Sequence, residues 1–400
     1  MNRKNQWLLG AMVGVILIGA NATAADDAKP AAKIRFEKKQ LDPVFRSEGV
    51  AVGDFNKDGK LDIAAGFVWY EAPDWKMHTI IEKVPAYDPK SYSNAFCTWA
   101  QDLNGDGWAD LIVVDFPGTP TWWFENPKEP GKLWPKHTCV PVTNNESPQF
   151  LDLDGDGKRE LILAYAPDTK NSDGPERRMG FAQPAKDPND LWHLHAVSAA
   201  AAPATQKYSH GLGVGDVNRD GRLDIVCPDG WWECPASANE SLEWKFHKAP
   251  LGGLAAQMYV YDFDGDGDND IIGSSPHAFG IWWYEQLPNG EWKQHEIDKS
   301  FSQTHAMCLA DLNGDGLPDF VTGKRWWAHT SGDPGVDEPA VFCWFELKRE
   351  KGRPVWTKHQ FDHDSGPGTQ FEVGDVNGDG LLDIISSNKK GVHFFRQVRE

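Results

Sequence analysis

The chain has 400 residues, of which 40% are hydrophobic and 25% charged, and this composition excludes a disordered or fibrous protein. Its formal net charge of −19 at pH 7 argues against nucleic-acid binding, which needs a basic surface. The sequence also lacks a glycine-rich phosphate loop, a Gly-x-Ser-x-Gly turn and a His-Glu-x-x-His pair, and so carries none of these common catalytic signatures.

The N-terminal segment, residues 1–24, is predicted to be a secretory signal peptide. Arg3 and Lys4 form a short basic start, residues 7–20 form an uncharged apolar run, and residues 22–24 have the small-x-small form of a cleavage site. A membrane anchor is the alternative, but the run is shorter than the roughly 20 residues that span a bilayer. We therefore expect a mature chain of residues 25–400, secreted or periplasmic, with no transmembrane segment after cleavage.

One acidic pattern, Asp-x-[Asp/Asn]-x-Asp-Gly-x-x-[Asp/Glu], recurs seven times in the remaining sequence. Its copies begin at Asp54, Asp102, Asp152, Asp216, Asp262, Asp311 and Asp375. Four of the steps between copies are 46 to 50 residues long and two are 64 residues long. A fixed period of this length is typical of a repeat architecture, here with insertions in two copies.

Each copy of the pattern lies between two short apolar runs that read as β-strands, such as 50–52 and 61–65 around the first copy. A third run is rich in aromatic residues, and a fourth carries the pattern Trp-x-x-His. The six Trp-x-x-His pairs are Trp75/His78, Trp134/His137, Trp192/His195, Trp244/His247, Trp292/His295 and Trp356/His359. We predict that these side chains pack between sheets or hydrogen-bond to neighbours rather than bind a ligand.

Four strands in each period predict an all-β fold, a seven-bladed β-propeller with four-stranded blades. The blades are expected to start near residues 47, 93, 146, 209, 256, 304 and 369. The last copy lacks its fourth strand, whereas residues 33–40 form a spare strand near the N-terminus. We expect this strand to complete the last blade and close the ring, which leaves no open sheet edge. An open solenoid or two smaller domains would leave both observations unexplained.

The spacing of acidic residues within each copy suits a calcium ion, which is bound by about six to eight oxygen atoms. Positions 1, 3 and 5 turn inward as the loop curls, glycine at position 6 permits the sharp turn, and position 9 returns a carboxylate. We predict up to seven structural calcium ions; Asp-Gly turns without metal are the alternative. The predicted ligands are Asp54, Asn56, Asp58, Asp62, Asp102, Asn104, Asp106, Asp110, Asp152, Asp154, Asp156, Glu160, Asp216, Asn218, Asp220, Asp224, Asp262, Asp264, Asp266, Asp270, Asp311, Asn313, Asp315, Asp319, Asp375, Asn377, Asp379 and Asp383.

The repeated acidic loop resembles that of the FG-GAP/VCBS repeat family, and the resemblance covers nearly the whole mature chain. It implies a calcium-binding propeller of the secreted bacterial type. Members of this family include adhesion modules, lectin-like proteins and sugar lyases, so the resemblance implies carbohydrate or a cell-surface protein as partners without choosing between binding and catalysis.

The residues that lead into the innermost strands, and the loops that join second to third strands, are expected to meet at one mouth of the central channel. Polar side chains at these places predict a small-molecule site. The predicted substrate-binding residues are Glu48, Tyr92, Asn94, Gln149, Gln257, His277, Arg325, Trp326, His329 and Gln370. Phe96 and Glu146 occupy neighbouring positions of the same ring.

Three functions fit this sequence. The first is a calcium-stabilised propeller that binds carbohydrate or a cell-surface partner. The second is a sugar lyase or dehydratase in which His210, His305, Lys324 and Tyr208 perform acid–base chemistry. The third is a non-catalytic scaffold. A zinc ion held by His210, His305 and a third histidine is a weaker alternative, because no ligand pair lies close together in the sequence.

The six cysteines do not form a compact disulfide framework or a Cys-x-x-Cys pair. We therefore expect buried thiols in strands. Cys227 and Cys234 flank one predicted hairpin and are the only pair that merits a test for a disulfide.

Overall fold

A computed structural model describes residues 33–187, 189–239, 243–328 and 332–400. The predicted signal peptide and His329 lie outside these ranges. Within them, no helix has the length and hydropathy of a membrane span.

The regular elements of the described chain are all β-strands except a single 3-10 turn, η1 (Thr169–Asn171). The strands are β1 (Ile34–Asp42), β2 (Ala51–Gly53), β3 (Asp62–Ala65), β4 (Val68–Glu71), β5 (Lys76–Thr79), β6 (Cys97–Gln101), β7 (Asp110–Val114), β8 (Thr119–Phe124), β9 (Lys136–Thr143), β10 (Gln149–Leu151), β11 (Glu160–Tyr165), β12 (Arg178–Gln183), β13 (His193–Ala196), β14 (Leu212–Gly215), β15 (Asp224–Cys227), β16 (Gly230–Glu233), β17 (Lys245–Lys248), β18 (Gln257–Tyr261), β19 (Asp270–Ser274), β20 (Phe279–Gln286), β21 (Trp292–Ser302), β22 (Met307–Ala310), β23 (Asp319–Lys324), β24 (Val341–Arg349), β25 (Pro354–Asp362), β26 (Phe371–Gly374), β27 (Asp383–Asn388) and β28 (Gly391–Arg399).

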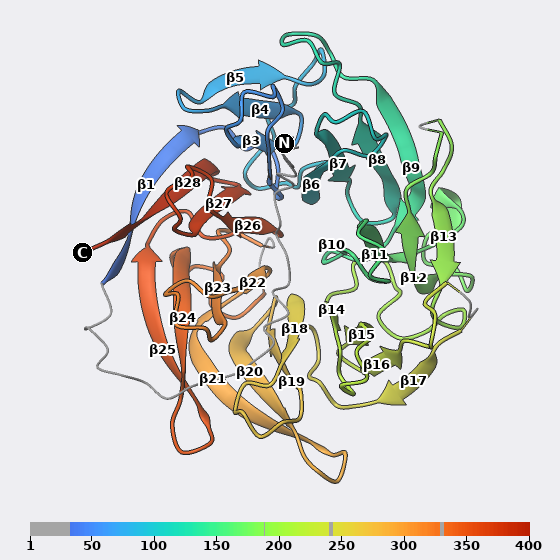
Figure 1. Ribbon diagram of the computed structural model, residues 1–400, viewed down its shortest axis with the longest axis vertical. Coiled ribbons are helices and arrows are strands. Elements are labelled where there is room, and N and C mark those ends of the chain that lie inside the picture. The colour runs from blue at the N-terminus through green and yellow to red at the C-terminus, as the bar shows by residue number, and fades with distance from the viewer. Residues whose placement is uncertain (1–32, 188, 240–242, 329–331) are drawn as a thin grey trace, which may run out of the picture.

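These strands pair in antiparallel groups of four that follow the chain, namely β2–β5, β6–β9, β10–β13, β14–β17, β18–β21 and β22–β25. The strands β26–β28 form a further group, whose fourth strand is β1 from the opposite end of the chain. Figure 1 shows the groups arranged around a common centre, with the labelled first strands β6, β10, β14, β18, β22 and β26 innermost. The fold is therefore all-β and propeller-like, as the repeat predicted.

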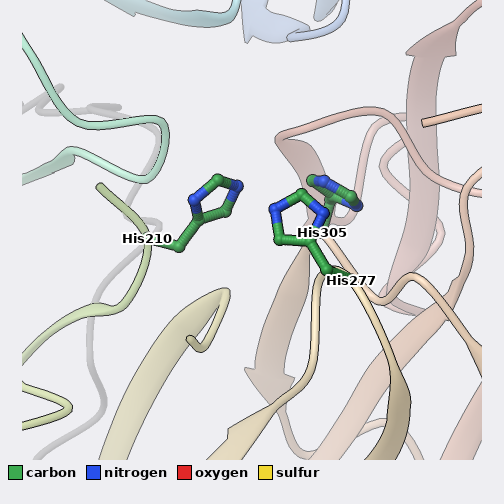
Figure 2. A group of neighbouring side chains, drawn as sticks. All are labelled: His210, His277 and His305. Carbon is green, nitrogen blue, oxygen red and sulfur yellow. The ribbon is translucent and has the colours of Figure 1, made fainter. Parts of the chain in front are cut away.

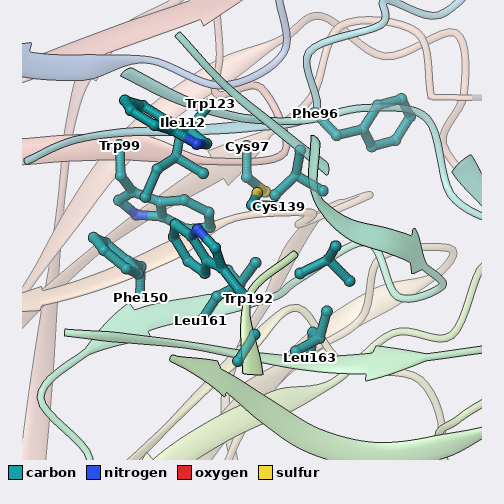
Figure 3. Close-up of a cluster of buried hydrophobic side chains, with 13 residues drawn as sticks. Phe96, Cys97, Trp99, Ile112, Trp123, Cys139, Phe150, Leu161, Leu163 and Trp192 are labelled. Atoms are coloured by element: carbon teal, nitrogen blue, oxygen red, sulfur yellow. The ribbon is translucent and has the colours of Figure 1, made fainter. Parts of the chain in front are cut away.

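Burial differs between the strands of a group and is greatest in the second strand. The second strands are buried along almost their whole length, as in β7, whereas fourth strands such as β5 are largely exposed. Neighbouring groups share hydrophobic clusters, and Figure 3 shows the one between β6–β9 and β10–β13, in which Trp99, Trp123 and Trp192 are buried. A comparable cluster joins Val50 and Ile63 to Ile385 and Phe394, which links β2–β4 to β26–β28.

The histidines of the Trp-x-x-His strands have the structural role that the sequence predicted. Each imidazole stacks on the aromatic ring opposite it on the third strand, with ring centroids 4.1 to 4.5 Å apart. In the β14–β17 group, for example, His247 stacks on Trp231 and its Nε2 atom lies 2.6 Å from Oε2 of Glu233. Trp134, Trp192 and Trp244 are buried in the clusters between groups.

Polar side chains at the centre join groups that are far apart in sequence. Thr369 donates its backbone N–H to the Glu48 carbonyl (2.9 Å) and its hydroxyl to the Phe96 carbonyl. The side chain of Gln257 donates to the Thr369 carbonyl (3.1 Å) and accepts from the Met307 N–H (2.9 Å). The centre is thus cross-linked by hydrogen bonds.

All six cysteines are free thiols, including Cys227 and Cys234. Five of them lie in strands and Cys234 directly follows β16; all are buried, as expected, except Cys308, which is half-buried.

Candidate functional site

The acidic loops join the first strand to the second strand in each group. The carboxylate at position 9 is buried and joins two backbone segments: Asp62 accepts the N–H of Phe55 (3.0 Å) and that of Ala72 (2.8 Å). Burial, together with the neighbouring acidic side chains Asp54 and Asp58, raises the pKa of Asp62 to about 7. Equivalent bonds to the start of the loop recur at Asp110, Glu160, Asp224, Asp270, Asp319 and Asp383.

The same loops bring several oxygen ligands together. The carboxylate at position 1 accepts backbone N–H groups across the turn, as Asp54 does from Asp58 (3.1 Å) and Gly59 (3.0 Å). Ligand oxygens lie within 4.8 Å of one another in two sets, Asp152/Asp154/Glu160 and Asp262/Asp264/Asp266. Oxygen donors at this spacing fit a hard cation such as calcium.

A second cluster lies at the opposite ends of the inner strands. His210 directly precedes β14, His305 precedes β22, and His277 lies in the loop between β19 and β20. Their ring nitrogens come within 4.8 Å of one another, and Figure 2 shows the His210 ring facing the other two. His210 and His305 are only 6% and 4% exposed. Gly211, at φ 88° and too close to Pro228 for a Cβ, allows the chain to turn into β14 immediately after His210.

Each of these imidazoles has a defined neighbour. The Nδ1 atom of His210 lies 2.7 Å from the Tyr208 carbonyl oxygen, and that of His305 lies 3.3 Å from the Gln303 carbonyl oxygen. The Nδ1 atom of His277 lies 3.2 Å from Oδ2 of Asp333.

Burial, the Arg325 charge and the two other histidines lower the pKa of His305 well below its ordinary value. Burial and the neighbouring His210 lower the pKa of His277. Both side chains are therefore neutral near pH 7, with one nitrogen lone pair each.

Glu146 connects the histidines to a second group of charges. Its Oε2 atom lies 3.2 Å from Nε2 of His210. Burial alone would raise the pKa of Glu146, but His210 and Arg325 lower it, so the side chain is a carboxylate.

The carboxylate of Glu48 is completely buried and contacts two cations, Arg325 and Lys389, the latter at 3.2 Å. The Lys389 ammonium lies 4.3 Å from the Tyr92 ring centroid and 4.7 Å from that of Trp327. Burial and the Arg325 charge lower the pKa of Lys389 to about 8. Nε and Nη1 of Arg325 have no hydrogen-bond partner among the described residues.

Several predicted site residues lie elsewhere or act differently. Gln257 and Gln370 use their side-chain oxygens to accept backbone N–H groups at the centre. The side chain of Asn94 is exposed and donates to Asp115, and Gln149 is half-buried at the start of β10. Lys324 is buried, with Glu338 and Asp337 as its charged neighbours.

The sequence predicted some of the aromatic residues on this face but not all of them. Tyr208 is 45% exposed, and its ring packs on Phe116, so that its carbonyl rather than its phenol contacts His210. Trp326 is half-buried, with Lys390 over its ring. Trp327 was not predicted, although it directly follows the predicted pair Arg325 and Trp326.

The sequence also left Asp333 and Lys389 unidentified. Lys389 lies between a second and a third strand, the same position that predicted His277 and Arg325 in other groups. Asp333 lies in the long loop between β23 and β24, at no repeated offset. One small cavity, lined by Phe55, Trp69, Trp108 and Trp134, lies beside the first acidic loop and not at the histidines.

Two segments of the chain, residues 102–163 and 262–322, match the family described as the FG-GAP-like repeat. Among solved structures, an Agrocybe aegerita lectin that recognises non-reducing terminal N-acetylglucosamine is similar, with 14% identity, a TM-score of 0.47, and coverage of 92% of this chain and 86% of the lectin. The rhamnogalacturonan lyase YesW has 12% identity and a TM-score of 0.44, with 92% and 74% covered. The V. cholerae biofilm matrix protein Bap1 has 18% identity and a TM-score of 0.37, with 72% and 43% covered. Identities this low do not indicate a shared function.

Proposed function

Since this chain belongs to the FG-GAP-like repeat family, we propose that it is an extracytoplasmic, calcium-stabilised, seven-bladed propeller that binds carbohydrate at the face carrying His210, His277 and Arg325. The predicted signal peptide supports the location. The remaining parts of the proposal rest on separate observations.

The closed ring is supported by strand pairing and by packing. The groups of four described strands would correspond to blades, and each predicted blade start lies within four residues of the beginning of a first strand. β1 pairs with β28 from Ile34 opposite Arg399 to Gln40 opposite His393. The contacts of β2 with both β6 and β26 would close the circle.

Calcium is supported by the acidic loops. Their position 1 and position 9 carboxylates fix the turn through backbone hydrogen bonds, while side chains such as Asp58 remain at the loop surface. The loop acids would hold the ions, and each ion would cancel the repulsion between carboxylates. Its role would be structural.

The carbohydrate site rests on one observation above all: the buried guanidinium of Arg325 keeps two N–H groups without a hydrogen-bond partner among the described residues. Buried donors of this kind are uncommon and indicate a missing ligand or water. The half-buried aromatic rings of Trp326 and Trp327 and the exposed ring of Tyr208 lie on the same face. A few directed polar groups among aromatic rings are typical of small-molecule sites.

The test is a binding screen of the mature protein in excess calcium against neutral and uronic oligosaccharides. Arg325→Lys would keep the charge beside Glu48 but lose the forked donor geometry, and we expect affinity to fall about tenfold or more. Arg35→Lys is the control, because Arg35 lies on the outer strand β1 and forms a 2.9 Å ion pair with Glu400. The proposal would be rejected if no sugar bound, which would favour the scaffold, or if both variants bound as the wild type does.

A sugar lyase or dehydratase is the second candidate, because Nδ1 of His277 lies 3.2 Å from Oδ2 of Asp333 and the His277 ring lies beside that of His210. An imidazole oriented by a carboxylate can act as a general base. It would take the proton next to a carbonyl or carboxyl carbon, the neighbouring C–O bond would break to leave a carbon–carbon double bond, and the departing oxygen would take up a proton. Appearance of the ultraviolet absorbance of a conjugated double bond, lost in His277→Ala, would support catalysis over binding alone.

A further inference from the structure

We infer that His210, His277 and His305 form a binding site for one transition-metal ion of the zinc class, separate from the acidic loops. The three side chains come from different strand groups, and their ligand nitrogens lie within 4.8 Å of one another. Only the tertiary fold brings them together.

The hydrogen bonds around the rings set which nitrogen is presented. The carbonyl oxygens of Tyr208 and Gln303 can only accept, so the Nδ1 atoms of His210 and His305 carry hydrogen. The carboxylate of Asp333 acts in the same way on Nδ1 of His277. In each ring, Nε2 is then the atom with the lone pair. A ligating histidine commonly has this arrangement, with its other nitrogen donating to a carbonyl or carboxylate.

Glu146 supplies an oxygen on the same side. Its Oε2 atom lies 3.2 Å from Nε2 of His210, and two ligands of one tetrahedral zinc ion, at bond lengths of about 2.0–2.1 Å, lie roughly 3.3 Å apart. Imidazole nitrogens and carboxylate oxygens are both zinc ligands, whereas calcium prefers oxygen ligands alone. The two kinds of site on this chain therefore select different ions.

The charges of the surrounding residues also favour a cation. The carboxylates near the histidines are Glu146, Asp333 and Glu48, and the cations are Arg325 and Lys389. These three carboxylates outnumber the two cations. Arg325 is itself held by Glu48, which reduces its repulsion of a bound dication.

The experiment uses the mature chain, purified without a histidine tag and kept in excess calcium so that the acidic loops are not limiting. Calorimetric titration with zinc should give one tight site per chain. His277→Ala and His305→Ala should each weaken that site roughly 100-fold or more. His247→Ala is the matched control, because its imidazole stacks on Trp231 on an outer strand, and it should bind zinc as the wild type does.

Cobalt provides a readout that does not depend on stability. Titration with Co²⁺ should give the intense visible absorption of a four-coordinate ion, and this band should be lost in both alanine variants while their near-ultraviolet circular dichroism stays native. Absence of a zinc site in the wild type, or an unchanged site in both variants, would overturn the inference. It does not rest on carbohydrate binding: zinc binding without sugar binding would refute only the proposed function, and sugar binding without zinc would refute only the metal site.

Discussion

The Nε2 atom of His210 lies 3.2 Å from Oε2 of Glu146, and this contact joins two strand groups at the candidate site. Glu146→Gln keeps the size of the side chain but removes its charge. We expect affinity for zinc to fall roughly 10- to 100-fold, with little change in melting temperature. Glu125→Gln is the control, because Glu125 contacts the structural His137 at 3.4 Å. Equal zinc affinities in the two variants would contradict this role for Glu146.

Glu48 holds two cations at the centre of the molecule. Glu48→Gln should lower the free energy of unfolding by roughly 3–5 kcal/mol, because the buried Arg325 and Lys389 would both lose the carboxylate that contacts them. Glu372→Gln serves for comparison. Burial raises the pKa of Glu372 to about 7, so at about pH 6 its carboxyl is mostly protonated and the amide replaces it at little cost. Urea denaturation at that pH measures the free energy of unfolding of both variants. Similar decreases in the two variants would argue against a special role for Glu48.

Removal of calcium should lower the melting temperature, because an ion bound only to the folded state stabilises it by mass action. Two variants of the first loop separate calcium binding from hydrogen bonding. Asp62→Asn should cost about 1–3 kcal/mol with or without calcium, since the carboxylate accepts two buried N–H groups. Asp58→Asn should reduce only the increase in melting temperature that calcium produces. Scanning calorimetry at increasing calcium concentrations measures these effects. Identical melting curves with chelator and with excess calcium would contradict a structural role for calcium.

The pairing of β1 with β28 should be necessary for stability. Phe36 on β1 is buried and packs on Phe361 of the neighbouring group, with ring centroids 4.6 Å apart. Phe36→Ala should therefore destabilise the protein by about 3–5 kcal/mol, whereas the exposed Lys39→Ala should have a small effect. If Phe36→Ala left the free energy of unfolding unchanged in chemical denaturation, the result would contradict a closed ring.

The stability at low pH should depend on Asp362. Burial would raise the pKa of this carboxyl, but its 2.6 Å ion pair with Lys38 and its bonds to Ser365 lower it well below the ordinary value. A lowered pKa means that the carboxylate stabilises the fold fully above about pH 4, and that this contribution is lost as the pH falls further. The stability difference between the wild type and Asp362→Asn should accordingly shrink below that pH. Asp364→Asn, at an exposed neighbouring carboxylate, should show no such trend.

The fold could be predicted largely because the acidic loop repeats at a nearly constant period, which locates the strand on either side of it. The same offset identified His210 and His305, since equal positions in a repeat lie at equal places around the centre. Side-chain directions could not be predicted in this way. Tyr208 occupies a suitable position, yet its ring turns toward Phe116, and Lys324 has Glu338 and Asp337 as charged neighbours. Asp333 lies in a loop whose path the repeat does not determine.

The hydrogen bonds of Thr369 have a consequence for how the molecule unfolds. In an open repeat array each unit contacts only its neighbours, so one end can melt while the other stays folded. Thr369 instead receives a bond from Gln257 and donates to Glu48 and Phe96. Gln257 belongs to the β18–β21 group, whereas Glu48 and Phe96 precede the first strands of the β2–β5 and β6–β9 groups. Loss of any one of these groups removes bonds from several others at once. Heating should therefore produce a single cooperative transition, with equal calorimetric and van't Hoff enthalpies.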